Sequence, residues 1–536
     1  MSLAVNEVKR NFYRDSMQLM RLTEKAKAIP GVSDAVLVMA TGTNKMLMEQ
    51  IGLLTSDGRS ATENDLVLAV RAKEGANMEQ VVSAIESLLT SQQGDGETSS
   101  SGTFFGISAA LDNLAGANLA IVSLPGTQAA GAAEELLKAG VNVHLFSDHV
   151  STDDELRLKK FAISKGLLVL GPGAGTSIIN GVGLGFANAV ARGKIGIVAA
   201  AGTGLQEVSV LLDRIGLGVS QGFGVGGTDI SKEVGGIMMM ECLRLLEDDV
   251  NTDLVAIVAK TPNTEVVRKV MSFVDKYTTK PVVACFLGLD ASSLGRIHYA
   301  KTLHSAVLRA ARLSSPTYVR AFDDKIGSSL QDFASSSRKL SSRLGPGQRY
   351  IRGLYTGGTL AHESLLLFSE ILSNNVYSNT PLSSEFGLSD PRMSQGHSVI
   401  DLGDEFFTEG RAHPMIDPTI RKLRILQEAK DHSVGVIILD FVLGYGASED
   451  PAGSLADSIS EGKEIASKSG RELVVMGHVC GTSADPQSLE RQSEKLTRVG
   501  VILYPSNAMM ALSSALTVSF ESVYDRLAKK WGGLVG

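Results

Sequence analysis

The chain has few cysteines: Cys242, Cys285 and Cys480 are the only three in 536 residues. They are far apart and odd in number, which argues against a disulfide framework and against a Cys-x-x-Cys metal site. Such usage is typical of a protein from a reducing cytoplasm, which is the location we expect. The first residues also lack a basic stretch followed by an apolar core, so no secretory signal peptide is expected.

An excess of basic residues and long apolar runs are also missing. The 51 Lys and Arg against 58 Asp and Glu give a formal net charge of −7, which does not favour nucleic-acid binding. Mean hydropathy is +0.10, yet no apolar run is long enough to span a bilayer. The apolar residues instead form short runs, as the buried strands of parallel sheets require.

Gly-Thr steps, in contrast, are frequent. Five strand-like apolar runs end in such a step and lead into a helix-like stretch, at Gly126-Thr127, Gly175-Thr176, Gly202-Thr203, Gly358-Thr359 and Gly481-Thr482. Glycine lets the backbone approach a ligand, and the first N–H groups of a helix attract phosphate or carboxylate. One step alone is most simply a strand-to-helix turn, whereas five indicate that several anionic groups are held. The predicted anion-binding residues are Thr176, Ser177, Gly202, Thr203, Gly204, Gly357, Gly358 and Thr359.

The apolar pattern predicts two regions before residue 193. Residues 1–91 have the strand and helix order of a small ferredoxin-like or ACT-like α+β domain, and residues 92–104 are predicted to be a flexible linker. Residues 105–192 alternate strands and helices as a Rossmann-like parallel sheet does. No Gly-x-Gly-x-x-Gly follows its first recognised strand, which argues against NAD or FAD.

The rest of the chain has a duplicated pattern. Residues 193–334 and 350–536 each contain a strand, a Gly-Thr turn, a helix and further strands, in the order of a flavodoxin-like domain. The serine-rich residues 335–349 are predicted to link them. Because parallel sheets bind ligands at the carboxyl ends of their strands, we expect the turns at Gly202-Thr203-Gly204 and Gly357-Gly358-Thr359 to face each other across a shared cleft.

A charge-dense loop over residues 401–418 is the main catalytic candidate. Arg411, expected to be exposed, suits neutralising a phosphate or carboxylate, His413 suits moving a proton, and acids such as Asp404 suit positioning them. Arg352, just before the second Gly-Gly-Thr turn, suits bidentate binding of an oxyanion at the cleft rim. We predict these four side chains to be catalytic; a solvated surface loop is the alternative for the three in the loop.

Two more polar residues lie near the ends of apolar strands. Asp440 stands close to the carboxyl end of one strand, and His478 lies just before the Cys480-Gly-Thr turn. Both are predicted ligand contacts because open parallel sheets bind ligands at that edge. A hydrogen-bonded scaffold role stays open for each. No metal is predicted, because the acids of the chain show no fixed ligand spacing.

Several strings in the chain are distinctive. Three of them are Ile351-Arg-Gly-Leu-Tyr-Thr-Gly-Gly-Thr-Leu360, Asp401-Leu-Gly-Asp404 and Gly410-Arg-Ala-His-Pro-Met-Ile-Asp-Pro418. With these strings the chain resembles the FdrA family, in the superfamily of NDP-forming succinyl-CoA synthetases, over nearly its whole length. The resemblance implies an α/β fold in which the small α+β domain is followed by a Rossmann-like CoA-binding-type domain and two flavodoxin-like CoA-ligase-type domains.

The chain departs from the pattern of these families at two places. Succinyl-CoA synthetases carry a phosphorylated histidine in a Gly-His-Ala-Gly-Ala-type loop, where this chain has Gly295-Arg-Ile-His298-Tyr-Ala-Lys. Because the neighbours of His298 are bulky, we predict that it is not phosphorylated. FdrA proteins usually have an acid and a cysteine where this chain has Gly173 and Ala174, so it cannot do what those residues do elsewhere.

The resemblance implies a subunit of an oxamate carbamoyltransferase-like enzyme of allantoin breakdown. Its reaction exchanges oxalurate and phosphate for oxamate and carbamoyl phosphate, and its partners are the other subunits of a hetero-oligomer. The alternative is an acyl-CoA synthetase-like (NDP-forming) enzyme that uses CoA and a nucleotide, with a partner supplying the missing domain. A third interpretation is a non-catalytic regulatory or assembly subunit whose N-terminal domain senses a small ligand.

Overall fold

The computed structural model describes most of the chain, namely residues 4–12, 14, 16–91, 104, 106–114, 116–260, 262–372 and 374–535. The chain forms two compact units. The first comprises residues 1–103 and 402–420, and the second comprises residues 104–401 and 421–536. The predicted linker at residues 92–104 lies outside the described residues, apart from Phe104.

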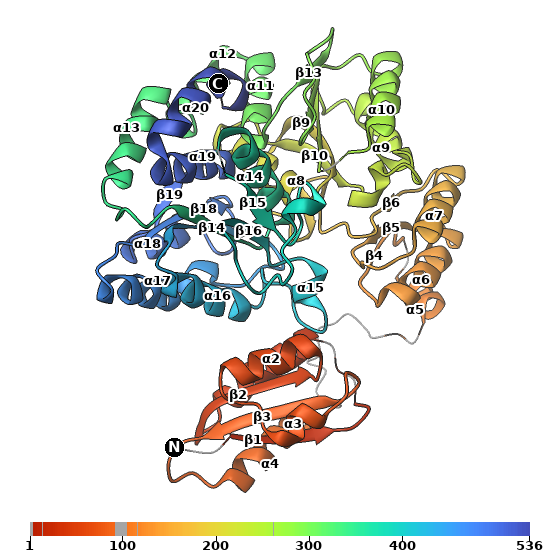
Figure 1. The fold of residues 1–536 in the computed structure, drawn as a ribbon. Coiled ribbons are helices and arrows are strands. Elements are labelled where there is room, and N and C mark those ends of the chain that lie inside the picture. The colour runs from red at the N-terminus through yellow and green to blue at the C-terminus, as the bar shows by residue number, and fades with distance from the viewer. Residues whose placement is uncertain are drawn as a thin grey trace. The chain divides into compact units, whose positions relative to one another are not determined.

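The first unit is built on a three-stranded antiparallel sheet in the order β1-β3-β2. Its elements are β1 (Ala4–Lys9), α1 (Ser16–Lys27), β2 (Val32–Met39), α2 (Gly42–Gln50), α3 (Ser56–Ser60), β3 (Leu66–Ala72), α4 (Met78–Ser91) and, from the later segment, α15 (Glu405–Thr408). Residues of β2 alternate between two cores, with Leu37 packed on the face of α1 and α4 and Val38 on the face of α2. Figure 1 shows α2 and α4 on opposite faces. The small α+β domain is confirmed.

The second unit begins with a small parallel sheet in the order β4-β5-β6. The elements here are α5 (Ile107–Asn113), β4 (Leu119–Val122), α6 (Gly126–Lys138), β5 (Asn142–Leu145), α7 (Thr152–Ser164) and β6 (Val169–Leu170). The step at Gly126 opens α6 as predicted. Strands and helices alternate, which confirms the Rossmann-like arrangement.

A seven-stranded sheet follows, in the order β13-β12-β11-β9-β10-β7-β8. Its strands and helices are β7 (Thr176–Ile179), β8 (Val182–Gly185), β9 (Arg192–Ala200), α8 (Gly202–Arg214), β10 (Val219–Gly224), α9 (Ile237–Asp248), β11 (Leu254–Ala259), α10 (Thr264–Tyr277), β12 (Val282–Phe286), β13 (Ile297–Tyr299), α11 (Leu303–Ser314), α12 (Pro316–Lys325) and α13 (Leu330–Ser341). The hairpin β7-β8 joins β10 antiparallel, whereas β9 to β13 are parallel.

The last sheet has six parallel strands in the order β15-β16-β14-β17-β18-β19. The elements are β14 (Tyr350–Tyr355), α14 (Gly358–Ile371), β15 (Val376–Ser378), β16 (His397–Asp401), α16 (Thr419–Lys430), β17 (Val434–Val442), α17 (Pro451–Lys468), β18 (Val474–Cys480), α18 (Leu489–Arg498), β19 (Ile502–Tyr504), α19 (Asn507–Val518) and α20 (Phe520–Leu534). In Figure 1, α16 and α17 lie on one face of this sheet and α14 and α19 on the other.

The two large sheets pair their strands in the same register. The comparison starts from Val198 and Leu354, each four residues before the glycine that opens the next helix, Gly202 or Gly358. Across three strands it runs as Val198–Ile257–Ala284 in one sheet and as Leu354–Leu439–Gly477 in the other. The next residue on the third strand is Cys285 in one sheet and His478 in the other, so these two residues hold equivalent positions. The predicted duplication is therefore visible strand by strand.

Some local expectations are wrong. Of the predicted linker over residues 335–349, residues 335–341 belong to helix α13, which ends at Ser341. The step at Gly175-Thr176 opens strand β7 and not a helix. The reason lies just beyond it: Asn180 and Gly181 have φ of 52° and 82°, so this Asn-Gly pair forms the hairpin turn between β7 and β8.

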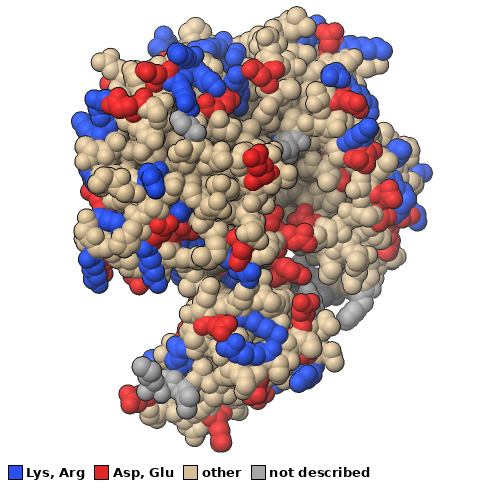
Figure 2. Space-filling model, in the orientation of Figure 1, with Lys and Arg blue, Asp and Glu red and all other residues tan. Residues whose placement is uncertain are grey.

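Bulk features of the structure agree with the composition. The three cysteines are buried and free of disulfides. Lys and Arg are interspersed with Asp and Glu on the face drawn in Figure 2. Within the described residues, no helix is both long and apolar enough to cross a membrane.

Candidate functional site

The two Gly-Thr turns that open α8 and α14 lie in direct contact. The N–H of Thr359 donates a hydrogen bond to Oγ1 of Thr203 at 3.2 Å. A Cβ added to Gly204 would lie 3.0 Å from Cγ2 of Thr359, and one added to Gly357 would lie 2.9 Å from Cγ2 of Thr203. Glycine is therefore required where the turns pack. The two turns meet as predicted, but as a junction of helix N-termini in contact.

Two charged side chains reach the second turn. Lys260 directly follows β11, and Asp401 ends β16. A Cβ added to Gly358 would lie 3.2 Å from Nζ of Lys260 and 2.5 Å from Oδ2 of Asp401. Asp401 is buried, and its carbonyl accepts a hydrogen bond from Nδ2 of Asn379 at 2.8 Å. The carboxyl ends of strands from both large sheets thus bring opposite charges to one helix start.

The electrostatics of this junction favour an anion. The helices α8 and α14, of 13 and 14 residues, each present the positive end of a helix dipole. Lys260 adds a positive charge that the buried Asp401 beside it opposes, so the two helix N-termini supply the excess of positive potential. Burial and then the charge of Lys260 lower the pKa of His362, on α14, to about 4, so its imidazole is neutral at pH 7. Lys260 and the helix N-termini can therefore hold a phosphate or carboxylate.

Asp440 binds the backbone of the second turn. Its carboxylate accepts the N–H of Thr356 at 2.9 Å and the N–H of Gly357 at 2.7 Å, and it forms an ion pair with Nη2 of Arg421 at 2.7 Å. The side chain is fully buried. Because these donors occupy the carboxylate, we interpret Asp440 as a positioning residue for the turn, which is the scaffold role left open by the sequence.

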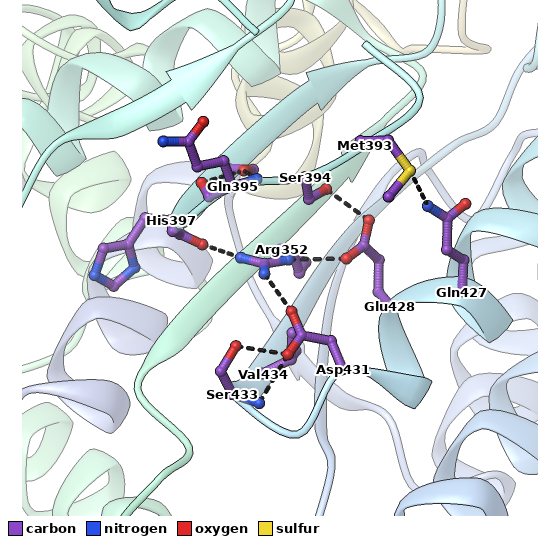
Figure 3. A network of polar contacts seen from close by, with 12 residues as sticks. Arg352, Met393, Ser394, Gln395, His397, Gln427, Glu428, Asp431, Ser433 and Val434 are labelled. Carbon is purple, nitrogen blue, oxygen red and sulfur yellow. Dashed lines mark hydrogen bonds and ion pairs between the residues drawn. The ribbon is translucent and has the colours of Figure 1, made fainter. Parts of the chain in front are cut away.

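Arg352 lies in a buried ionic network and not at the rim of the site. Figure 3 shows its guanidinium between Glu428 and Asp431, with Nε 2.8 Å from one carboxylate and Nη2 2.8 Å from the other. Nη1 also donates to the carbonyl of Gly396. Arg352 is 2% exposed and stands six residues before Gly358. Its donors bind structural partners, so Arg352 does not offer the oxyanion contact expected at the cleft rim.

The remaining catalytic candidates belong to the first unit. The carboxylate of Asp404 accepts the N–H of Phe406 at 3.2 Å and caps α15. Nδ1 of His413 accepts the N–H of Met415 at 3.2 Å, which fixes a local turn. Both residues therefore have a structural use that the sequence did not indicate.

Arg411 differs from its expected exposure. Its side chain is 5% exposed, and Nη2 lies 2.8 Å from Oδ2 of Asp417. Although burial raises the pKa of Asp417, the charge of Arg411 and hydrogen bonds lower it below its ordinary value. Replacing a buried, paired arginine leaves its carboxylate without a partner and costs folding stability. The expectation that Arg411 is exposed is therefore wrong.

Thr176 and Ser177 are the first two residues of strand β7. Both are buried, and Oγ of Ser177 accepts the N–H of Gly224 at 3.1 Å. This bond ties β7 to β10, which is a packing role. Because β7 is a strand, these residues offer no helix N-terminus to an anion.

Behind the junction, α8 and α14 carry glutamates at the same position. Glu207 and Glu363 each lie five residues after the glycine that opens their helix. Glu207 accepts the N–H of Asn507, the first residue of α19, at 3.2 Å. Glu363 accepts the N–H of Leu303, the first residue of α11, at 2.7 Å. Each half thus has a carboxylate that accepts the first N–H of a helix in the other half. These two hydrogen bonds hold the halves together.

His478 is the partner of the first glutamate. Its Nε2 lies 2.6 Å from Oε2 of Glu207, and its Nδ1 is 3.2 Å from the carbonyl of Tyr504. Although burial raises the pKa of Glu207, His478 lowers it below its ordinary value. One ligand atom each from Glu207, His478 and Cys480 lie within 4.8 Å of one another. Burial raises the pKa of the Cys480 thiol, so it stays protonated. His478 is a buried scaffold residue.

Sequence reasoning missed Lys260, Asp401 and His362 as site residues. A signal for the first two was present: each directly ends a buried parallel strand, at the sheet edge where ligands bind. His362 follows the second Gly-Thr turn by one helical turn and had no such signal.

Three family models match the chain. A model described as CoA-ligase matches residues 354–516, a CoA binding domain matches residues 191–288, and an AllF heavy metal-associated domain matches residues 1–103. The CoA-binding match lies in the first of the two duplicated halves. A CoA-binding-type domain was expected earlier in the chain, over residues 105–192. The two contacting turns thus come from the CoA-binding segment and the CoA-ligase segment.

Individual proteins also match the chain. The protein YahF of Escherichia coli (strain K12) is 42% identical over 507 residues, covering 94% of this chain and 96% of YahF. The succinate–CoA ligase [ADP-forming] subunit alpha of Methanothermobacter thermautotrophicus is 28% identical over 186 residues, 34% of this chain and 61% of that protein. An ATP citrate lyase structure from Methanothrix soehngenii matches at 13% identity over 80% of this chain and 86% of that chain, with a TM-score of 0.32.

The fold and the matched models define a protein of the CoA-ligase, succinyl-CoA synthetase-like superfamily. The chain belongs to the family of YahF. This corrects the main functional expectation. The matched models describe CoA-binding and CoA-ligase domains, and the succinate–CoA ligase relative is a CoA ligase, so the alternative, an acyl-CoA synthetase-like enzyme, fits better than a carbamoyltransferase.

The description of the third model raises the question of a heavy metal. Residues 1–103 contain neither cysteine nor histidine. Thiolate and imidazole are the ligands that soft and borderline heavy metals prefer. The residues present in this domain therefore do not fit such an ion.

Proposed function

We propose that the protein is an acid–thiol ligase-type enzyme that joins a small carboxylic acid to CoA at the expense of a nucleotide. The observation that carries the proposal is the junction of the α8 and α14 N-termini beside Lys260. The junction brings together the segments similar to CoA-binding and CoA-ligase domains. It offers positive charge and backbone donors where the phosphate of an acyl phosphate would be held.

The proposed chemistry has two balanced steps. A carboxylate takes the terminal phosphoryl group of a nucleoside triphosphate, giving an acyl phosphate and the diphosphate. The sulfur of CoA then attacks the carbonyl carbon, the bond to the phosphate oxygen breaks, inorganic phosphate leaves, and the thiol proton passes to solvent. Lys260 and the helix N–H groups stabilise the charge that grows on the departing phosphate, which is the term that such preorganised donors supply.

The phosphate route differs from that of the succinyl-CoA synthetases. His298 lies within strand β13, paired in register with Val283, between bulky neighbours. We propose that it carries no phosphoryl group and that a partner subunit supplies the nucleotide-binding domain. Incubation of the purified complex with radiolabelled nucleotide, followed by mapping of acid-labile label, tests the first part; label on His298 contradicts it.

The second step can be tested in reverse without a nucleotide. The protein is incubated with inorganic phosphate and each of a panel of acyl-CoA esters, from acetyl-CoA to succinyl-CoA, and free thiol is measured. We expect phosphate-dependent release of CoA from at least one ester. Lys260→Met should lower kcat/KM by about 10²–10³-fold, the loss typical of one donor to a developing oxyanion.

A matched control is Lys276→Met, which removes the same charge from an exposed position on helix α10 of the same half. It should leave the rate within about twofold. Thiol release that does not need phosphate, or absence of release from every ester both alone and with co-purified partner subunits, contradicts the proposed function.

A further inference from the structure

A cavity of about 240 Å³ is lined in part by Glu363 of α14. It is formed by the loop after β12, the residues before α11, one face of α14 and the end of α20. Its polar wall includes Asp290, Lys301, Glu363 and Glu370, and its apolar wall includes Leu366 and Leu534. All of these residues lie in the second unit. The cavity is separate from the residues around Lys260, although α14 contributes to both.

Among the residues that the structure describes, Glu363 differs from the other lining carboxylates in having no cationic partner. Asp290 pairs with Lys301 at 3.2 Å, and Glu370 pairs with Lys530 at 2.9 Å. Within the described residues, Glu363 receives hydrogen bonds from neutral donors: the N–H of Leu303 on Oε1, and Nδ2 of Asn507 at 2.8 Å on Oε2. Its side chain is 1% exposed. A buried carboxylate without a cation is costly unless it is protonated or receives one.

The equivalent glutamate in the other half has an imidazole as its neighbour. Glu207 faces His478 at 2.6 Å. The residue equivalent to His478 is Cys285, which offers Glu363 a protonated thiol in place of an imidazole; burial and then Glu363 raise the pKa of that thiol. Where one half has an imidazole, the other has a cysteine and a cavity.

Several ionisable groups surround Glu363 on the elements packed against it. Glu207 on α8, Cys285 on β12 and Tyr355 on β14 interact with it electrostatically. Lys301 and Asp290 stand across the cavity as a pair. Burial first, and then the negative charge of Glu207, raise the pKa of Glu363 to about 7.

These features select the class of occupant. A divalent cation needs several oxygen ligands, but Asp290 and Glu370 are each paired with a lysine, and the leucines of the apolar wall provide no oxygen. A single unpaired carboxylate above a hydrocarbon wall suits a compact molecule with one charged nitrogen and a short alkyl part. We propose that this cavity binds a small primary alkylammonium compound whose nitrogen donates to Glu363 and whose carbon chain lies against Leu366 and Leu534.

The test is a calorimetric titration of the full-length protein with n-butylammonium at pH 8. We expect saturable binding, with 1-butanol and butyrate, which lack the cation, at least tenfold weaker. The single tryptophan, Trp531, precedes Leu534 by about one turn of α20, and its fluorescence gives an independent readout of the same site.

Glu363→Gln should weaken n-butylammonium binding at least tenfold, while Glu370→Gln, on the same wall, should change it less than twofold. The wild-type protein supplies a test that needs no variant. Because a proton competes with the ammonium for Glu363, affinity should fall about tenfold from pH 8 to pH 6. No saturable binding at pH 8, equal binding of 1-butanol, or an affinity unchanged in Glu363→Gln and across this pH range overturns the proposal.

Discussion

Glu207 and Glu363 occupy the same place in two similar halves, yet their environments are opposite. Each lies five residues into a helix opened by Gly-Thr, and each binds the first N–H of a helix in the other half. Glu207 has an imidazole 2.6 Å away, and its pKa is lowered despite burial. Glu363 has a thiol at the equivalent position, and burial raises its pKa to about 7. The residue on the neighbouring strand thus accompanies opposite pKa shifts of the two buried glutamates, downward beside the imidazole and upward beside the thiol.

The comparison is tested most strongly by giving Glu207 the cysteine neighbour that Glu363 has. His478→Cys should remove the partner of Glu207 and lower the free energy of unfolding by about 3–5 kcal/mol at pH 8, the cost of leaving a buried charge unpaired. Chemical denaturation measures it. Cys285→Ala, at the equivalent position, removes no ion pair and is the control, with a loss of about 1 kcal/mol. Equal losses of unfolding free energy in the two variants contradict the assigned contact between Glu207 and His478.

The second glutamate should show itself in the pH dependence of stability. Its pKa rises from an ordinary 4.5 to about 7 on folding, so the native state binds the proton more tightly. Stability should therefore fall as pH rises from about 4.5 to about 7 and level off above, by roughly 3 kcal/mol. Glu363→Gln should remove this part of the profile. Parallel profiles for wild type and variant, from urea denaturation between pH 5 and pH 8, contradict the shift.

The two helix-opening glycines offer a smaller and cleaner contrast. A Cβ at Gly358 would lie 2.5 Å from Oδ2 of Asp401, whereas nothing lies within 4 Å of one at Gly202. Gly358→Ala should cost about 1–3 kcal/mol of unfolding free energy through overpacking. Gly202→Ala should be within about 0.5 kcal/mol of wild type. A similar cost at both positions argues against the crowding of Lys260 and Asp401 over the second turn.

The smallest expected effect concerns the bond between the turns. Thr203→Val removes the acceptor of the Thr359 N–H and should cost about 1 kcal/mol. Thr359→Val keeps that N–H and the methyl group near Gly204, so it should cost less. Thermal unfolding of both variants under one set of conditions decides the order, and the reverse order argues against the bond.

Much of the fold could be predicted because it follows from local pattern. Short apolar runs predicted buried parallel strands, and Gly-Thr predicted the helix starts at Gly126, Gly202 and Gly358. The failure at Gly175 came from ignoring Asn180-Gly181, a stronger hairpin signal than the Gly-Thr step was for a helix. Gly481-Thr482 also opens no helix directly, because the N–H of Thr482 donates to Asp485 at 2.8 Å.

The site was harder to predict because its side chains are set by distant partners. Arg352 suited an oxyanion by position, yet its guanidinium is held by Glu428 and Asp431, 76 and 79 residues further along the chain. His478 meets a glutamate from the other half. No sequence pattern encodes such pairings in a single chain, whereas Lys260 was recognisable as a charge at the end of a buried strand.

The central claim is that two helix N-termini and Lys260 form one anion site. Calorimetric titration with inorganic phosphate measures it most directly, independently of any acyl-CoA chemistry. The account predicts saturable binding that weakens at least tenfold in Lys260→Met and stays within twofold of wild type in Lys276→Met. Phosphate affinity that is unchanged when Lys260 is replaced, in a variant that folds normally, would contradict it.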